Sequence, residues 1–284
     1  EGMRAYGNSH GFVGSYCSTR HSVSCAVIAQ SGEAMQRDHW YTTARDAKRL
    51  DDVEAVGRTA AQRTVRRLDG RRLPTGTVPV LYTPEVASGL LSHFIGAIRG
   101  DSLYRRSTFL LDSLGTLVFP KFVTLREEPH LRGALGSAPF DSEGVRTQAR
   151  DIVADGVVQG YVLDSYSARK LSLATTGNAG GVHNLSINTG NSDYDGLVRQ
   201  MHRGLIITEL MGQGVNKVTG DYSRGAAGFW VEHGAIAYPV EEITVAGNLR
   251  DMYADIVAVG NDVDTRRSIR TGSILIARMT VAGT

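Results

Sequence analysis

Histidine and cysteine, the side chains that most readily bind transition metals, are scattered through this sequence. Eight histidines and two cysteines occur, without the His-Glu-x-x-His or paired Cys-x-x-Cys spacing of common zinc sites. The closest grouping is Cys17-x3-His21-x3-Cys25. On a strand these residues share a face, but neighbours lie roughly 13 Å apart and a fourth ligand is missing. The spacing therefore favours ordinary packing over a metal site.

Other chemical motifs are equally sparse. The sequence has no G-x-S-x-G elbow, and Ser167-Ala-Arg-Lys170 stands without supporting motifs. A catalytic triad, whose members meet only in space, stays open at this stage. Gly177–Gly181 and Gly212–Gly214 do not follow the spacing of phosphate-binding loops. We interpret both as turns.

Five arginines gather near the end of an expected helix, at Arg63, Arg66, Arg67, Arg71 and Arg72. They lack interleaved aromatic residues and do not extend into a stripe. Lys and Arg together exceed Asp and Glu by only two (31 − 29), so the chain as a whole does not favour nucleic acid or an anionic membrane as a partner. A solvated helix end is the simpler interpretation.

The densest unusual segment is Gly220–Trp230 (GDYSRGAAGFW). Its small residues allow another backbone to approach, and Asp221, Tyr222, Ser223 and Arg224 are candidate contacts to a peptide or a partner. Two interpretations are open. The segment is either a bulged strand beside a tight turn, or a surface that takes an extended peptide by strand addition.

Elements that position these residues can be predicted from periodicity. Alternation predicts strands over 11–16 and 22–28, and helical spacing predicts a helix over 51–69. A short strand over 78–82 precedes a helix over 84–98, for which Thr83 is the expected cap and Pro84 the first residue. That helix has an apolar surface too wide for a solvent-facing helix, so we expect it to be buried.

The second half of the chain returns to strands. Asp155-Gly156 and His233-Gly234 predict hairpin turns, a short helix is expected over 195–202, and strands over 205–211 and 273–281. The predicted class is α+β, strand-rich, with a mostly antiparallel sheet in the larger C-terminal domain and a few helices packed on it. We place a boundary in the linker-like segment after Leu73, giving domains 1–73 and 74–284.

Composition fits an ordinary globular protein. Glycine is the exception, at 33 of 284 residues, about 12% against a usual ~7%. The sequence shows no apolar stretch near 18 residues and no signal pattern, which predicts a cytoplasmic protein without membrane contact. The chain starts inside an apparent strand without an initiator Met, so we expect it to be the carboxyl part of a longer product.

Several longer motifs resemble the TldD/PmbA family, and specifically its PmbA (TldE) branch. The resemblance covers essentially the whole chain. The motifs that carry it are NSHG at 8–11, SYCSTRH at 15–21, STFLLDSLG at 107–115, PFDSEGVR at 139–146, SYSARK at 165–170, TELMGQG at 208–214, GDYSRGAAGFW at 220–230 and ITVAGNL at 243–249.

The resemblance implies a heterodimeric zinc metalloprotease of the bacterial cytosol, acting on unfolded or peptide substrates such as peptide-antibiotic precursors and antitoxins. In that pair the TldD subunit holds zinc with a His-Glu-x-x-x-His helix and a later Cys. Alignment on Gly100-Asp101 places those helix positions at Leu91, Ser92 and Gly96, with the Cys near Val259. None of these residues can replace the ligands or the carboxylate.

The resulting hypothesis is a non-catalytic subunit that binds no cofactor itself, with zinc in a TldD-type partner. Formation of a homodimer without that partner is left open. One alternative is a binding protein that modulates DNA gyrase or another nucleic-acid enzyme, for which the arginine cluster is the only feature in favour. A second alternative is a peptidase with a non-metal site.

Overall fold

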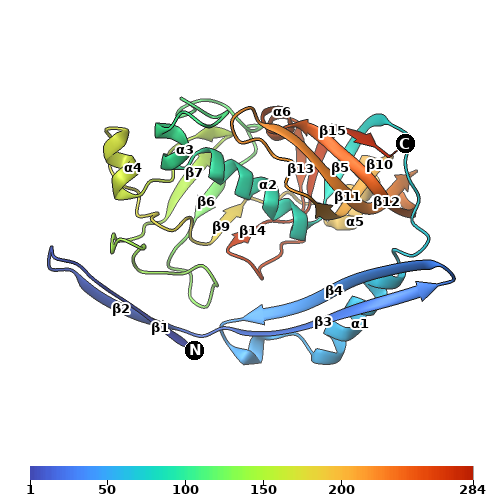
Figure 1. Ribbon diagram of the computed structural model, residues 1–284, viewed down its shortest axis with the longest axis horizontal. Helices are drawn as coiled ribbons and strands as arrows, with labels where there is room; N and C mark the ends of the chain where they lie inside the picture. Colours follow the sequence, from blue (N-terminus) through green and yellow to red (C-terminus); the bar gives the residue numbers. More distant parts are fainter. Residues whose placement is uncertain (284) are drawn as a thin grey trace.

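Alternating polar and apolar residues at the start of the chain form two long β-hairpins. The computed structural model describes residues 1–283, and Figure 1 shows the hairpins lying below the rest of the molecule. They consist of β1 (Gly2–Gly7) with β2 (Val13–Ser18) and β3 (His21–Ser31) with β4 (Ala34–Ala44). A 3-10 turn (Ala47–Arg49) leads to α1 (Val53–Val65), which packs on β3 and β4.

The predicted helix over 51–69 is thus confirmed, with shorter ends. Asp52 caps α1 by accepting a hydrogen bond from the backbone N–H of Ala55, 3.1 Å away. Such a cap satisfies one of the free N–H groups at a helix start.

A six-stranded sheet forms the larger part of the C-terminal domain. Its order is β12 (Ala235–Asn248), β11 (Asp221–Glu232), β10 (Gly204–Met211), β5 (Gly76–Tyr82), β15 (Ile274–Ala282) and β13 (Ile256–Val259). Only β5 and β10 run parallel in this sheet. Because β12 also pairs with β15, five of the strands close into a ring, to which β13 is attached.

A smaller five-stranded sheet lies beside the ring. Its order is β14 (Ile269–Arg270), β9 (Leu185–Ile187), β6 (Leu125–Glu127), β7 (Arg150–Ala154) and β8 (Val157–Val158). The turn between β7 and β8 is the predicted Asp155-Gly156 hairpin, and both residues have positive φ (49° and 77°). The His233-Gly234 turn between β11 and β12 has the same character, with φ of 53° and 73°.

Helix α2 (Pro84–Ala97) runs between the two sheets (Figure 1). Leu90, Leu91 and Phe94 are almost or fully buried in a core that both sheets share. The predicted buried helix is confirmed, and so are the predicted positions of Thr83 and Pro84 at its start. Although Thr83 occupies the N-cap position, its hydroxyl makes no capping hydrogen bond, and Pro84 alone marks the start.

Four shorter helices complete the domain: α3 (Gly100–Tyr104), α4 (Ser165–Lys170), α5 (Tyr194–Met201) and α6 (Leu249–Ala254). Helix α5 covers a second apolar cluster on the other face of the ring, with Leu197 fully buried. Antiparallel pairs dominate both sheets, which confirms the α+β prediction. Within residues 1–283, no helix is both long enough and apolar enough to span a lipid bilayer.

Candidate functional site

A cleft of about 760 Å³ separates the β3–β4 hairpin from the C-terminal domain. We call it the interdomain cleft. One wall comes from the hairpin and its approach, through Tyr41 and Arg20. The opposite wall comes from helix α2, the end of β10, Arg224 on β11 and the loop 266–269. The cleft therefore joins parts of the chain that lie up to about 250 positions apart in the sequence.

The cleft face of α2 carries small and polar residues. Ser88, Gly89 and Ser92 line the cleft, whereas Leu91 has no exposed surface and packs in the core. A Cβ built on Gly89 would meet no atom within 4 Å, so no side chain covers the helix backbone at this part of the wall. Because an α-helix has 3.6 residues per turn, Ser92 faces the cleft while the preceding residue, Leu91, faces the core.

An ionic and aromatic network holds the hairpin against the start of α2. The Glu85 carboxylate lies 3.4 Å from the Arg63 guanidinium and 3.6 Å from that of Arg266. The same two arginines lie over the Trp40 ring, with guanidinium carbons 4.8 and 4.0 Å from its centroid. Asp264 pairs with Arg266 at 2.8 Å. Cations over an aromatic face at these distances are attractive, so the network fixes the position of the cleft wall.

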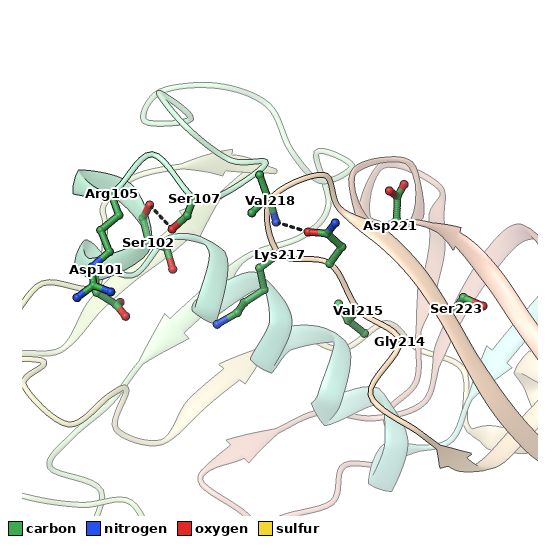
Figure 2. Close-up of a pocket in the computed structure, with 11 residues that line it drawn as sticks. Asp101, Ser102, Arg105, Ser107, Gly214, Val215, Lys217, Val218, Asp221 and Ser223 are labelled. Atoms are coloured by element: carbon green, nitrogen blue, oxygen red, sulfur yellow. Dashed lines mark hydrogen bonds between the residues drawn. The ribbon is translucent and has the colours of Figure 1, made fainter.

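The predicted contact residues lie on opposite sides of the sheet. Tyr222 is buried beneath α2, and Arg224 reaches the interdomain cleft. Asp221 and Ser223 instead line a second, open depression, shown in Figure 2. This separation follows from the two-residue period of a strand. The structure therefore places Tyr222 and Arg224 on one side of the sheet and Asp221 and Ser223 on the other, so the four residues do not form one site.

Strand addition at this segment, one of the two sequence interpretations, is wrong. Residues 221–224 pair with 245–248 of β12 on one edge. On the other edge, the Ser223 N–H donates to the Gly214 carbonyl (2.7 Å) and the Asn216 N–H to the Asp221 carbonyl (2.8 Å). Both edges are occupied, so no peptide can pair there. The alternative of a bulged strand is confirmed by register shifts after Ala226 and Trp230.

The depression in Figure 2 lies between α3 and the loop 212–219 and has a volume of about 730 Å³. We call it the α3 groove. Asp101 lines it from α3, Arg105 lines it from the position directly after α3, and Lys217 lines it from the loop. Asp101 forms an ion pair with Arg99 at 3.3 Å. The groove is open and of mixed charge, so its residues resemble a contact surface more than a reaction centre.

Burial controls protonation beneath α2. It raises the pKa of the Tyr222 hydroxyl, and it raises that of Tyr82 well above the ordinary value, so both hydroxyls stay protonated. The His93 ring lies edge-on to Tyr222, with centroids 6.1 Å apart. Burial lowers the His93 pKa, and the nearby Arg224 and Lys217 cations lower it further. This region therefore holds a neutral imidazole beside fixed positive charge.

The arginine cluster predicted to be a solvated helix end is held by specific contacts. Arg63, Arg67 and Arg72 form ion pairs with carboxylates. Arg66 and Arg71 lie over aromatic rings, at 5.0 and 4.8 Å from the centroids. Every member of the cluster is thus engaged within the fold.

Comparison with known proteins shows which protein family the chain resembles. Residues 75–283 match the PmbA/TldA metallopeptidase C-terminal domain, and residues 1–68 match the central domain of the same family. The chain belongs to this family. It is 54% identical over 282 residues to the metalloprotease PmbA of Escherichia coli O157:H7, covering 99% of this chain and 63% of that protein. A PmbA homolog of Haemophilus influenzae is 50% identical over 283 residues, again covering 99% of this chain and 63% of that protein.

Solved structures of other proteins share the fold. A proposed modulator of DNA gyrase from Bacteroides thetaiotaomicron superposes with a TM-score of 0.92 at 33% identity, covering 97% of this chain and 63% of that one. TldE from Thermococcus kodakarensis superposes with a TM-score of 0.88 at 22% identity, over 99% and 67% of the two chains, which shows the fold alone. The chain spans less than two thirds of the curated relatives named above.

The family name implies a metal, and the donor set of this chain does not fit one. Among residues 1–283, no three or more His, Cys, Asp or Glu side chains gather in a group that could hold a metal ion. Leu91 is buried in the core, Ser92 is exposed to the cleft and Gly96 is half-buried near Lys217. Val259 is also buried and has no donor atom in its side chain. Zinc sites need His, Cys or carboxylate ligands, so no chemical step is assigned to a metal in this chain.

Sequence reasoning missed most of the cleft wall. Arg20, Glu85, Arg266 and Arg267 meet there although they come from three separate segments. The Arg-Arg pair at 266–267 was a visible signal, but nothing in the sequence indicates that it faces Tyr41 and α2.

Proposed function

We propose that this chain is the non-catalytic subunit of a cytosolic, two-subunit metalloprotease of the TldD/TldE type. It would line the chamber that receives unfolded or peptide substrates, including peptide-antibiotic precursors and antitoxins. A TldD-type partner would supply the zinc. The observation that carries this proposal is the absence of donor side chains at three positions of α2: Leu91 and Gly96, at the positions that the resemblance assigns to the zinc-binding histidines, offer none, and Ser92 stands where a carboxylate is expected.

Within this proposal the predicted contact residues have different roles. Arg224 faces the peptide in the interdomain cleft, and Tyr222 supports it from beneath. Asp221 and Ser223 in the α3 groove are contacts to the partner subunit. We do not propose a nucleic-acid function, because the arginine cluster that suggested it is engaged in internal contacts.

Reconstitution with a TldD-type subunit tests the proposal. We expect co-purification of the two chains, and peptide cleavage only when both are present. Metal analysis after dialysis should find zinc with the partner and less than a stoichiometric amount with this chain alone. Cleavage by this chain without the partner, or one tightly held zinc per chain, would refute it.

A further inference from the structure

Three arginines in the interdomain cleft have no carboxylate partner. Arg20, Arg224 and Arg267 all line the cleft, and none of them forms an ion pair with any residue of the described range 1–283. The one carboxylate on the cleft wall, Glu85, is already paired with Arg63 and Arg266. The cleft therefore carries an excess of uncompensated positive charge.

Two of these arginines are held in place by neutral groups. The Arg20 Nε donates to the Thr43 hydroxyl and the Arg267 Nε to the Tyr41 hydroxyl, each at 3.3 Å. These bonds orient the guanidinium groups without neutralising them. A fork of N–H donors that is already oriented loses less conformational entropy when it binds a planar anion.

Arg224 has the strongest need for an acceptor. Its Nε is buried and has no hydrogen-bond partner in residues 1–283. The Tyr222 hydroxyl beneath it, in a residue only 2% exposed, lies close to both the Arg224 guanidinium and the Tyr82 hydroxyl. Leaving a buried donor unpaired is unfavourable, and more so when the group is charged. The Arg224 guanidinium therefore keeps a donor available for a ligand that brings acceptors.

The part of the cleft wall formed by α2 can accommodate a backbone. Gly89 and Ser92 leave α2 without long side chains here, and a Cβ at Gly89 would meet nothing within 4 Å. An extended segment can therefore lie along α2 with its acidic groups directed at Arg224. Guanidinium and carboxylate form two parallel hydrogen bonds, the strongest class of such contacts.

We propose that the interdomain cleft binds acidic peptide segments, with Arg224 receiving a carboxylate and Arg20 and Arg267 adding charge at the cleft mouth. This inference rests on the proposed function, because it assumes that the occupant is a peptide. It adds what the family comparison does not give, namely a preference for Asp or Glu in the segment that this subunit holds.

Binding to the isolated chain tests the inference without the zinc subunit. The probe is a fluorescently labelled, blocked peptide with alternating Gly and Glu, and its matched control has Gln in place of Glu. By anisotropy at low salt, we expect the Glu peptide to bind at least tenfold more tightly. Equal binding of the two peptides would overturn the proposal.

Variants locate the site. Arg224→Gln should weaken binding of the Glu peptide about tenfold, and Arg267→Gln should weaken it severalfold. Arg267 is exposed, so its replacement keeps the test valid if Arg224→Gln fails to fold. Arg58→Gln, on the exposed part of α1, removes the same charge away from the cleft and should change binding less than twofold. Equal effects at Arg58 and Arg267 would indicate general electrostatic attraction and refute a built site.

Competition separates the sources of the anion. The competitors are inorganic phosphate, a short single-stranded oligonucleotide and an unlabelled Glu peptide. If phosphate or the oligonucleotide displaces the labelled peptide at a lower concentration than the unlabelled Glu peptide does, the ligand is a phosphate and the carboxylate assignment is overturned.

If the reconstituted pair cleaves neutral peptides but this chain shows no acidic preference, only the inference fails. If the chain binds acidic peptides but proves dispensable for cleavage, the proposed function fails instead.

Discussion

The same substitution, glycine to alanine, should have opposite effects at Gly89 and Gly228. Gly89 lies inside α2, and an added Cβ meets nothing within 4 Å. Glycine in a helix interior is less favourable than alanine by about 1 kcal/mol, so Gly89→Ala should stabilise the protein by about that amount. For a unit of about 200 residues this raises Tm by roughly 2–4 °C.

Gly228 lies in the middle of β11, where a built Cβ would be 1.8 Å from the backbone carbonyl oxygen of Ile206 on β10. Neither atom can move without separating two paired strands of the closed ring. Overpacking of this kind costs typically 1–3 kcal/mol and occasionally more, and we expect Gly228→Ala to lie at the upper end. Urea unfolding and thermal melts measure both variants, with Gly57→Ala in α1 as a second open helical position. A loss of stability in Gly89→Ala would mean that the cleft face of α2 is covered, and would contradict the open cleft on which both proposals depend.

Three further predictions follow from the site. Leu91→Ala should lower the free energy of unfolding by about 2–5 kcal/mol because Leu91 is fully buried, whereas Ser92→Ala should change it by less than about 0.5 kcal/mol; similar values in urea titrations would show that the assigned helix faces are wrong. The pKa of His93 is lower in the folded state than its unfolded value of ~6.5. The unfolded chain therefore binds more protons, and the free energy of unfolding should fall as the pH drops below about 6.5. His93→Gln should flatten this decline, and an unchanged pH profile would exclude His93 as its source. Trp40→Ala removes the ring between two arginines, and hydrogen exchange should show faster opening of β4 while α2 keeps its protection; equal acceleration in both would indicate global destabilisation.

Local patterns predicted most elements correctly, because each depends on neighbouring residues. The Asp-Gly and His-Gly turns, the buried helix after Pro84 and the helix over 51–69 are all read from a few adjacent positions. Thr83 occupies the predicted cap position but makes no capping hydrogen bond, because that bond depends on where the hydroxyl points and not only on residue type. Strand addition at 221–224 failed because neither pairing partner, β12 or the turn at 214–216, is recognisable from that segment.

The cleft was less predictable than the fold. Arg224 was identified through its unusual segment, but Arg20 and Arg267 acquire a role only when the hairpin docks against α2. The docking depends on Trp40, Glu85 and Arg266, which are separated in sequence and brought together only by tertiary structure. Periodicity reports which face of an element is buried. It carries no information about which distant residue lies opposite.

The closed ring of strands has a consequence for how the protein is made. Strand β5, near residue 80, pairs with β15, near residue 278, and β15 also completes the ring with β12. Contacts so distant along the chain form slowly, and here they cannot form until residue 282 has left the ribosome. During translation one edge of β5 therefore stays unpaired until β15 emerges, and unpaired strand edges of this kind favour aggregation of the nascent chain.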